Sequence, residues 1–327
     1  ERLCRHYIAR HVAHHHLTIY HIGIKHDFQL FIREMANNRL ELVRSYGRLY
    51  AEIICIDVFQ TVISIDFAIA RKDFPTVSKQ IEAGISLFRG KKVGNKFIAY
   101  FQAYTNTYGP LEYLERIFKE ALSHPMVAGI SIATRPDCLG INVLNLLKSL
   151  KSEFADKFIW IELGLQTIHE QTALYIRRGY SLDVFEDALT RLQAANLPVI
   201  VHIILGLPGE TKAMMLATCR YLSKKNIFGI KLQLLHVLRN TDLANEFFKK
   251  SFEILAFEEY IDIVISCLEL LPPEVVIHRV TGDGPKELLI EPAWSLNKRN
   301  VLNTLHKELR LRETFQGRLS TPNDINL

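Results

Sequence analysis

Polar side chains recur within five apolar segments of the middle of the chain, and their types suit a ligand site. A carboxylate, imidazoles, an ammonium group and side-chain amides can together hold a polar cofactor, or a metal ion for hydrolysis. Side chains alternate along a strand, so these positions share one face. Burying them unpaired would cost about 1–3 kcal/mol each, which favours a lined cavity over a plain core. The positions are Tyr100, Gln102 and Tyr104; Ser131 and Arg135; Trp160 and Glu162; His202; and Lys231 and Gln233.

Each of these residues also has a structural interpretation. Glu162 stands two residues before Gly164 at a strand end, where a ligand would lie. The same carboxylate could instead form an ion pair with Arg135 or Lys231. His202 taken alone is more often a hydrogen-bonded core histidine, and only its place on the shared polar face gives a ligand role equal weight. The repetition over successive strands is what indicates a cavity near the carboxyl ends of the strands, where barrel active sites lie.

The segment Leu205–Thr211 carries a more specific pattern. Gly206 and Gly209 allow the backbone to approach a ligand closely, and Pro208 stiffens the turn. Thr211 can cap the helix that follows. An efficient turn between a strand and a helix would use the same residues, so this segment indicates a ligand only together with the polar strand positions.

The elements that position these residues alternate regularly from about residue 96 to residue 241. Short apolar strands alternate with amphipathic helices, which predicts parallel pairing with right-handed crossovers in an α/β, (β/α) barrel-type core. No G-x-G-x-x-G follows any strand, so a dinucleotide-binding sheet has no support. The predicted strands are 97–103, 127–133, 158–163, 199–205 and 229–235, and the predicted helices are 78–88, 111–123, 141–154, 182–195 and 212–225.

The flanking regions divide the chain further. Residues 1–65 form an atypical, poorly defined segment that holds seven of the thirteen histidines, with a helical pattern over 28–54 and a strand-like run over 53–58. A metal site near Cys4 is one interpretation of that histidine cluster, and compositional bias is the other. We assign the barrel core to 66–241, a C-terminal extension to 242–316 and a flexible tail to 317–327. The extension is predicted to contain a helical region over 242–271, a strand over 275–280 and a helix over 296–312.

Bulk properties narrow the class of protein. The chain has 327 residues, 48% hydrophobic and 23% charged, with a net charge of +5. This composition is that of a globular protein, and the mild basicity permits a nucleic-acid partner without arguing for one. Five scattered cysteines indicate reduced thiols, and no apolar run reaches membrane-spanning length. We therefore expect a soluble, cytoplasmic protein with no membrane partner.

Several blocks of the sequence are similar to a known family. In order and spacing they resemble the YhcC-type radical SAM proteins, which are themselves similar to the radical SAM part of the Elongator catalytic subunit without its acetyltransferase domain. The resemblance covers about residues 66–315 and implies a partial (β/α)6 TIM-like barrel with a C-terminal strand–helix extension. The blocks are YFQAYTNT at 100–107, ATRPDC at 133–138, ELGLQT at 162–167, GLPGE at 206–210 and GIKLQLLH at 229–236, followed by PPEV at 272–275, His278-Arg279 and Pro292-Ala293-Trp294.

The resemblance implies a small-molecule cofactor, S-adenosylmethionine, bound across the strand ends. In the family a [4Fe-4S] cluster, fed by an external electron donor, cleaves it to a 5′-deoxyadenosyl radical. By position, Gln102–Asn106 would lie near the methionine end, Glu162 and Gln166 at the ribose or amino group, and Ile204–Gly206 along the adenine. The catalytic residues stay unassigned. The candidate cofactor-binding residues are Gln102, Tyr104, Thr105, Asn106, Arg135, Glu162, Gln166, His202, Ile204, Gly206, Gln233 and His236.

The chain departs from the family at the cluster. The family binds its iron with three cysteines that end in a Cys-x-x-Cys pair, and this chain has no Cys-x-x-Cys anywhere. Tyr46-Gly47 and Asp66–Ala68 fit the family's flanks, but the cysteines between them are missing, and Cys55 alone cannot hold a cluster. A frame-disrupted gene upstream of about Asp66 explains this, and so does a genuine relative without a cluster.

Three functions therefore compete. The first is a radical SAM enzyme, or a copy impaired at its cluster, with an RNA substrate suggested only by analogy with Elongator. The second is a non-catalytic barrel that binds a nucleotide-like ligand or RNA. The third is a metal-dependent hydrolase using Glu162, His202 and His236, which lacks a clustered motif such as H-x-H. The second function would use the cations Lys91, Lys92, Lys298, Arg299, Lys307, Arg310 and Arg312.

Overall fold

The computed structural model describes residues 62–65, 76–88, 95–102, 105–282 and 284–320. By packing, the chain divides into two compact units. Among the described residues, the first unit holds those up to Ile161 together with Ala195–Pro198, and the second holds Glu162–Ala194 and everything from Val199 onward. The predictions made for residues 1–61 lie outside the described residues, and the predicted domain boundaries stay predictions.

Seven strands form one sheet in the order β1-β2-β3-β4-β5-β6-β8, so the strands follow one another across the sheet in chain order. This order with parallel pairing is the (β/α) pattern that the sequence predicts. The sheet strands are β1 (Val62–Ile65), β2 (Phe97–Phe101), β3 (Val127–Thr134), β4 (Phe158–Gln166), β5 (Val199–Leu205), β6 (Gly229–Leu234) and β8 (Val276–Arg279), while β7 (Val237–Leu238) and β9 (Leu289–Glu291) pair separately and antiparallel.

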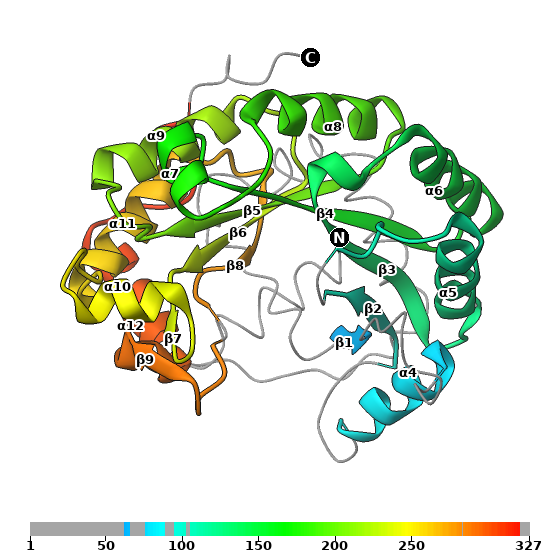
Figure 1. The fold of residues 1–327 in the computed structure, drawn as a ribbon, viewed down its shortest axis with the longest axis horizontal. Coiled ribbons are helices and arrows are strands. Elements are labelled where there is room, and N and C mark those ends of the chain that lie inside the picture. The colour runs from blue at the N-terminus through cyan, green and yellow to red at the C-terminus, as the bar shows by residue number, and fades with distance from the viewer. Residues whose placement is uncertain (1–61, 66–75, 89–94, 103–104, 283, 321–327) are drawn as a thin grey trace. The chain divides into compact units, whose positions relative to one another are not determined.

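The first unit contains β1 to β3, the start of β4, and the helices α4 (Val77–Ser86), α5 (Leu111–Ser123) and α6 (Ile141–Glu153). Strand β2 is buried at all five positions, as a strand covered on both faces should be. Helix α5 begins after Pro110 and packs against β3 and α6, as Figure 1 shows. Its buried residues recur with helical spacing, so one face meets the core: Leu114, Ile117, Phe118, Ala121 and Leu122.

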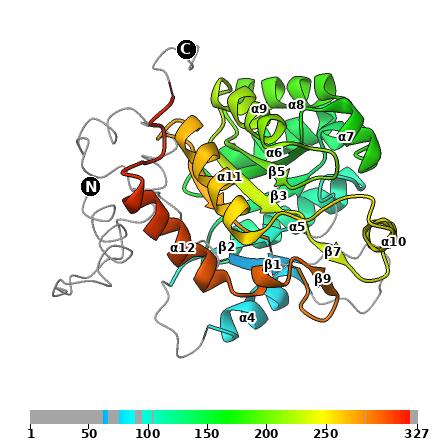
Figure 2. The same ribbon diagram turned by 90° about the vertical axis from the view of Figure 1, so that its left-hand side faces the viewer.

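The second unit contains the end of β4, strands β5, β6 and β8, and the remaining helices. Helix α11 is buried along most of its length and packs against both α9 and α12; Figure 2 shows α11 and α12 from the side. The helices are α7 (Glu170–Tyr175), α8 (Leu182–Ala194), α9 (Lys212–Ser223), α10 (Asp242–Phe248), α11 (Phe257–Leu270) and α12 (Lys298–Leu311).

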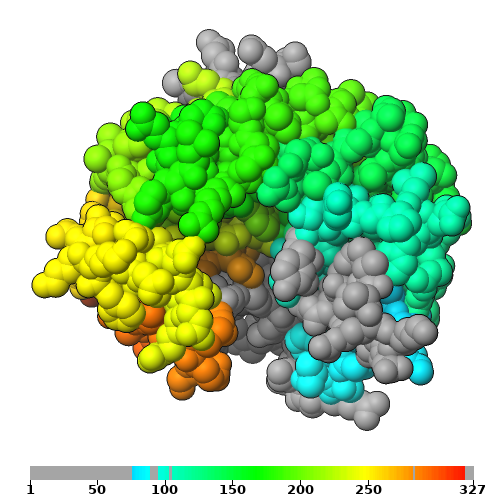
Figure 3. Space-filling view, viewed as in Figure 1, coloured from blue at the N-terminus to red at the C-terminus, as the bar shows by residue number. Residues whose placement is uncertain are grey.

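The structure confirms the strands and helices predicted between residues 78 and 235 and extends or adds a few. Strand β4 continues three residues past the predicted end, to Gln166, and β1, α7 and the β7–β9 pair were not predicted. The helical region predicted over 242–271 consists of two helices, α10 and α11. The chain leaves α10 at Lys250, whose φ of 57° is left-handed, and apolar residues on both sides hide that break. The segment 240–256, yellow in Figure 3, forms part of the surface, and Phe248 within it is 67% exposed.

Candidate functional site

The second unit contains a buried network of charged and polar side chains on three adjacent strands. The Glu162 carboxylate, on β4, accepts a hydrogen bond from His202 Nε2 on β5 at 2.6 Å. The same carboxylate oxygen forms an ion pair with the Lys231 ammonium group on β6. Gln233 Nε2, also on β6, lies 3.1 Å from His202 Nδ1. The network therefore joins two residues of the predicted site to Glu162 and adds Lys231.

The strand register explains why these side chains meet. His202 pairs with Lys231, and Ile204 pairs with Gln233, so alternate residues of the two strands share a face. This face opens toward the carboxyl ends of the strands. Ile204 and Gln233 are half-buried there, whereas Leu205 on the opposite face is buried. Glu162 and Lys231 lie deeper and are 4% and 6% exposed.

The charges in this network are fixed by mutual contact. Burial alone would raise the pKa of Glu162, but the Lys231 charge and the His202 hydrogen bond hold that pKa well below its usual 4.5. Burial lowers the pKa of Lys231, and Glu162 opposes that shift. Burial also lowers the pKa of His202 below 6.5, so the imidazole is neutral at pH 7. If the neutral His202 ring accepts a hydrogen bond from the Gln233 amide at Nδ1, its proton is on Nε2. From Nε2 the ring then donates a hydrogen bond to the Glu162 carboxylate.

Strands β4 and β5 both end in left-handed backbone on this side of the second unit. Gln166, the last residue of β4, has a φ of 67°, and Gly206, directly after β5, has a φ of 85°. A Cβ on Gly206 would come within 2.9 Å of the Leu255 side chain. Glycine is therefore required at this position both for its backbone and for space. Thr211 caps α9 as predicted, by accepting from Met214 N.

The sequence did not point to the residues that hold the end of β4 in place. The Arg178 side chain is 1% exposed; its guanidinium donates to the carbonyls of Leu165 and Thr167 and pairs with Glu170. The Tyr180 hydroxyl donates to the carbonyl of Gly164 at 3.0 Å. These contacts fix the backbone on both sides of Gln166. The only signal in the sequence was the Arg177-Arg178-Gly179 run ahead of the predicted helix 182–195, and it looks like an ordinary polar loop.

In the first unit, the predicted residues make their own contacts. Asn106 is fully buried, and its side-chain amide donates to the carbonyls of Phe101 and Ala133, both at 3.0 Å. Arg135 forms a two-point ion pair with Asp137 at 2.9 and 2.6 Å. Arg135 and Lys231 were the two predicted partners of Glu162. Since Arg135 pairs with Asp137, the ion pair with Glu162 is the one formed by Lys231. Gln102 is exposed and Thr105 half-buried, while Tyr104 lies outside the described residues.

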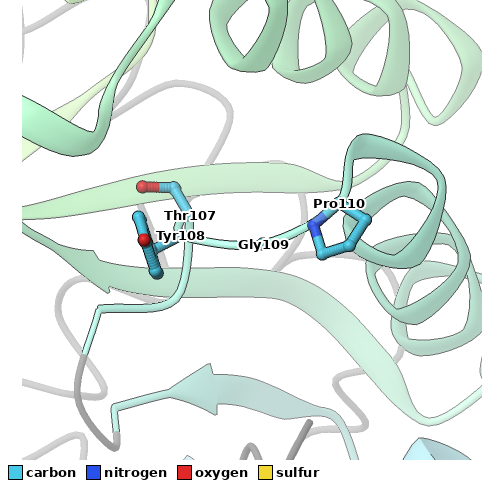
Figure 4. A pocket seen from close by; sticks show the side chains of 4 residues that line it. All are labelled: Thr107, Tyr108, Gly109 and Pro110. Carbon is cyan, nitrogen blue, oxygen red and sulfur yellow. The ribbon is translucent and has the colours of Figure 1, made fainter.

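A surface pocket of about 400 Å³ lies in the first unit beside these residues. It is lined by Thr107, Tyr108, Gly109 and Pro110, which connect the predicted methionine-end block to α5, as Figure 4 shows. The Thr107 hydroxyl lies 2.5 Å from that of Thr134 and donates to the carbonyl of Cys138. These bonds fasten the lining of the pocket to the end of β3.

The described residues do not fit an iron–sulfur cluster. Nowhere in the described ranges do three or more His, Cys, Asp or Glu side chains gather as metal ligands. Cys219 and Cys267 are buried, and a hydrogen bond between them, together with burial, raises the pKa of Cys267 well above 9.0. Burial and Asp137 likewise raise the pKa of Cys138. Thiolates are the ligands that iron requires, and these environments disfavour them.

Comparison with known proteins identifies the class. The family model of the radical SAM superfamily matches residues 70–222, and that of the Radical_SAM C-terminal domain matches residues 227–310. The chain belongs to the radical SAM superfamily. Within it, the chain is 44% identical to YtqA of Bacillus subtilis (strain 168) over 223 residues, which is 68% of each protein. It is 30% identical to YhcC of Escherichia coli (strain K12) over 232 residues, 71% of this chain and 74% of that protein. It is thus of the YhcC type, as the sequence blocks predict.

A solved structure supports the fold. The archaeal Methanocaldococcus infernus Elp3 with an N-terminal deletion matches with a TM-score of 0.65 at 18% identity, covering 78% of this chain and 64% of that one. The α/β fold predicted from the sequence, a partial (β/α) barrel of parallel strands, is therefore confirmed. Across the described parts of the chain, every helix is too short or too polar to cross a membrane.

Proposed function

We propose that this chain binds S-adenosylmethionine at the carboxyl ends of strands β4 to β6. The observation that supports the proposal is the buried Glu162–His202–Lys231 network, which lies deeper on the same face than the half-buried Ile204 and Gln233. A purely structural core has little reason to bury a carboxylate, an ammonium group and an imidazole together, because each desolvation is costly. A site that must orient a polar, charged cofactor gains from such a fixed base.

Each residue has a distinct part in this proposal. Glu162, held ionised, would accept hydrogen bonds from the ribose or amino group, and Gln166 would accept or donate hydrogen bonds there. Gly206 lets the backbone of the segment Ile204–Gly206 lie against the adenine, because no Cβ intervenes. Gln233 would extend the polar surface on β6. The residues of the first unit that were predicted to contact the methionine end, Gln102 to Asn106 and Arg135, stay predictions.

Radical chemistry is not part of what we propose for this chain. With a [4Fe-4S] cluster, S-adenosylmethionine supplies a 5′-deoxyadenosyl radical, but the sequence has no Cys-x-x-Cys and the described thiols do not fit iron. We therefore propose a copy that is impaired at its cluster and keeps the cofactor barrel. Its free thiols and its family are consistent with a cytoplasmic location.

Equilibrium dialysis of the full chain against labelled S-adenosylmethionine, without iron, tests the proposal. We expect saturable binding, and we expect Glu162→Gln to weaken it at least about tenfold, as for the loss of a charged hydrogen bond. Glu186→Gln is the matched control, because that glutamate pairs with Lys225 on the surface. Wild-type binding that does not saturate would contradict the proposal.

Anaerobic iron–sulfur reconstitution tests the proposed impairment at the cluster. We expect no absorbance at the cluster band and no cleavage of S-adenosylmethionine by reductant. Stoichiometric iron uptake with cleavage would show an intact radical enzyme and overturn the impairment.

A barrel that binds RNA without cofactor chemistry is the second candidate. Helix α12 favours it, since the exposed side chains of Lys298, Arg299, Lys307 and Arg310 follow one another along it. Arg312 is instead engaged by Asp262 and Glu308. RNA binding with a steep salt dependence, in the absence of S-adenosylmethionine binding, would favour this candidate.

A further inference from the structure

His236 and Thr281 occupy equivalent places at the edge of the second unit. His236 stands two residues after the end of β6, and Thr281 stands two residues after the end of β8. These strands are parallel neighbours, so both residues leave the sheet at its carboxyl edge. Ligands of parallel α/β sheets bind at that edge.

The backbone next to Thr281 lies directly on the His236 ring. A Cβ at Gly282 would be 2.6 Å from His236 Cε1, and a Cβ at Gly284 would be 2.8 Å from His236 Nδ1. No real side chain is accommodated at such distances, so the two glycines are what allow this approach. Thr281 directly precedes Gly282, so its backbone lies next to the segment that covers the His236 ring.

Both residues carry a buried polar atom with an unmet hydrogen bond. His236 Nε2 and Thr281 Oγ1 are inaccessible to solvent and have no hydrogen-bond partner among the described residues. Thr281 is only 8% exposed. Buried polar atoms nearly always have a hydrogen-bond partner. Two such atoms without one, His236 Nε2 and Thr281 Oγ1, therefore indicate a partner that is not part of the described chain. A ligand that hydrogen-bonds to both atoms would supply it.

The surrounding charge favours an anionic partner. Burial lowers the pKa of His236, and the positive charges of Lys298 and Arg279 lower it further. The ring is therefore neutral at pH 7 and can donate one hydrogen bond without adding charge. A neutral imidazole and a hydroxyl in the positive field of Lys298 and Arg279 suit an oxyanion such as a phosphate or a carboxylate.

We propose that His236 and Thr281 bind an oxyanion group of a second ligand, the substrate, rather than the cofactor. The site lies within residues 227–310, the part of the chain that matches the Radical_SAM C-terminal domain. Only its assignment to a substrate rests on the proposed function; the anion site itself does not.

The test uses the full chain labelled with [13Cε1]-histidine, with the His236 resonance assigned by loss in His236→Gln. Titration with inorganic phosphate, and separately with acetate, should move that resonance saturably in at least one case, and the responding anion identifies the group. Thr281→Val removes only the hydroxyl and should weaken binding at least about tenfold. Thr281→Ser should retain binding, and Thr190→Val, on the exposed face of α8, should not change it.

Two outcomes would overturn the proposal. One is a His236 resonance that neither anion moves, and the other is equal affinity in Thr281→Val and the wild type. Unlabelled S-adenosylmethionine that moves the resonance and displaces the anion would assign the site to the cofactor and sink the substrate assignment. Because cofactor binding is measured separately by dialysis, failure here is distinguishable from failure of the proposed function.

Discussion

The two units of this molecule treat their buried polar residues differently. In the first unit, the buried Asn106 and Thr107 hydrogen-bond to backbone carbonyls and to the Thr134 hydroxyl, while the partly exposed Arg135 pairs with Asp137. In the second unit, Glu162 and Lys231 form a buried ion pair that reaches across strands. Local contacts of the first kind fasten loops, whereas a buried ion pair is a poor choice for stability alone. The difference places the best evidence for a ligand in the second unit.

This contrast also bears on the proposed impairment at the cluster. The residues that could orient a cofactor from the second unit do not depend on cysteine. A copy impaired at its cluster can therefore keep these residues, including the ion pair of Glu162 and Lys231. If no ligand bound at this ion pair, replacing both Glu162 and Lys231 by apolar residues of similar size would often leave the stability of the fold unchanged or raise it.

The largest expected effect comes from breaking the buried ion pair. Lys231→Met leaves the Glu162 carboxylate buried without its counter-charge, and we expect the free energy of unfolding to fall by about 3–5 kcal/mol. Denaturant unfolding measures it. Lys119→Met in the first unit is the matched control, since that exposed lysine pairs with Glu115 and Glu153 on the surface and should change little. Equal losses in the two variants would remove the contrast between the units.

The second prediction concerns how the free energy of unfolding depends on pH in the acid range. Burial lowers the pKa of His278, on β8, to about 3 from 6.5. The unfolded chain therefore takes up this proton first, and stability is lost as the pH falls from about 6.5 toward 3. In His278→Phe, the fall of unfolding free energy between pH 6 and pH 4 should be smaller by about 1.4 kcal/mol per pH unit.

His124, in the first unit, sharpens this test. It is only half-buried, and burial lowers its pKa in the same direction. His124→Phe should therefore change the pH dependence less than His278→Phe does. A larger change in His124→Phe would show that the acid sensitivity lies in the first unit.

The third prediction isolates the glycine after β5. Gly206→Ala forces a side chain into left-handed backbone and against Leu255, and we expect a loss of about 2–3 kcal/mol. Gly209→Ala shares the left-handed φ, at 81°, but meets nothing within 4 Å and should lose about 1 kcal/mol. Thermal or denaturant unfolding of both variants separates contact from strain, and equal losses would exclude the Leu255 contact as a cause.

Sequence periodicity predicted the fold because strands buried on both faces are continuous apolar runs. Helix α5 and strand β5 begin and end at the predicted residues. The face of Glu162, His202 and Lys231 was also predictable, because alternation along a strand is a local property. Their hydrogen bonds were not, since the same three residues could have paired with other partners.

Other parts of the site could not be read from the sequence, because they depend on contacts between distant residues. Arg178 supports β4 from a loop, and the backbone after Thr281 lies against the His236 ring only because Gly282 and Gly284 have no side chain. Left-handed backbone at Gln166 carries no sequence signal, as glutamine rarely adopts it. The helical break at Lys250 is hidden for the same reason.

The smallest effect is expected at Asn106, and it decides whether the first unit holds a ligand residue or a loop anchor. Asn106→Ala removes the donor shared by the carbonyls of Phe101 and Ala133, and we expect a loss of about 1–2 kcal/mol in unfolding free energy. If the residue is an anchor, the affinity for S-adenosylmethionine should change no more than stability does. A variant that keeps its stability but loses cofactor binding would instead place Asn106 on the ligand, and the contrast drawn between the two units would then fail, because both would contribute buried polar groups to the same chemistry.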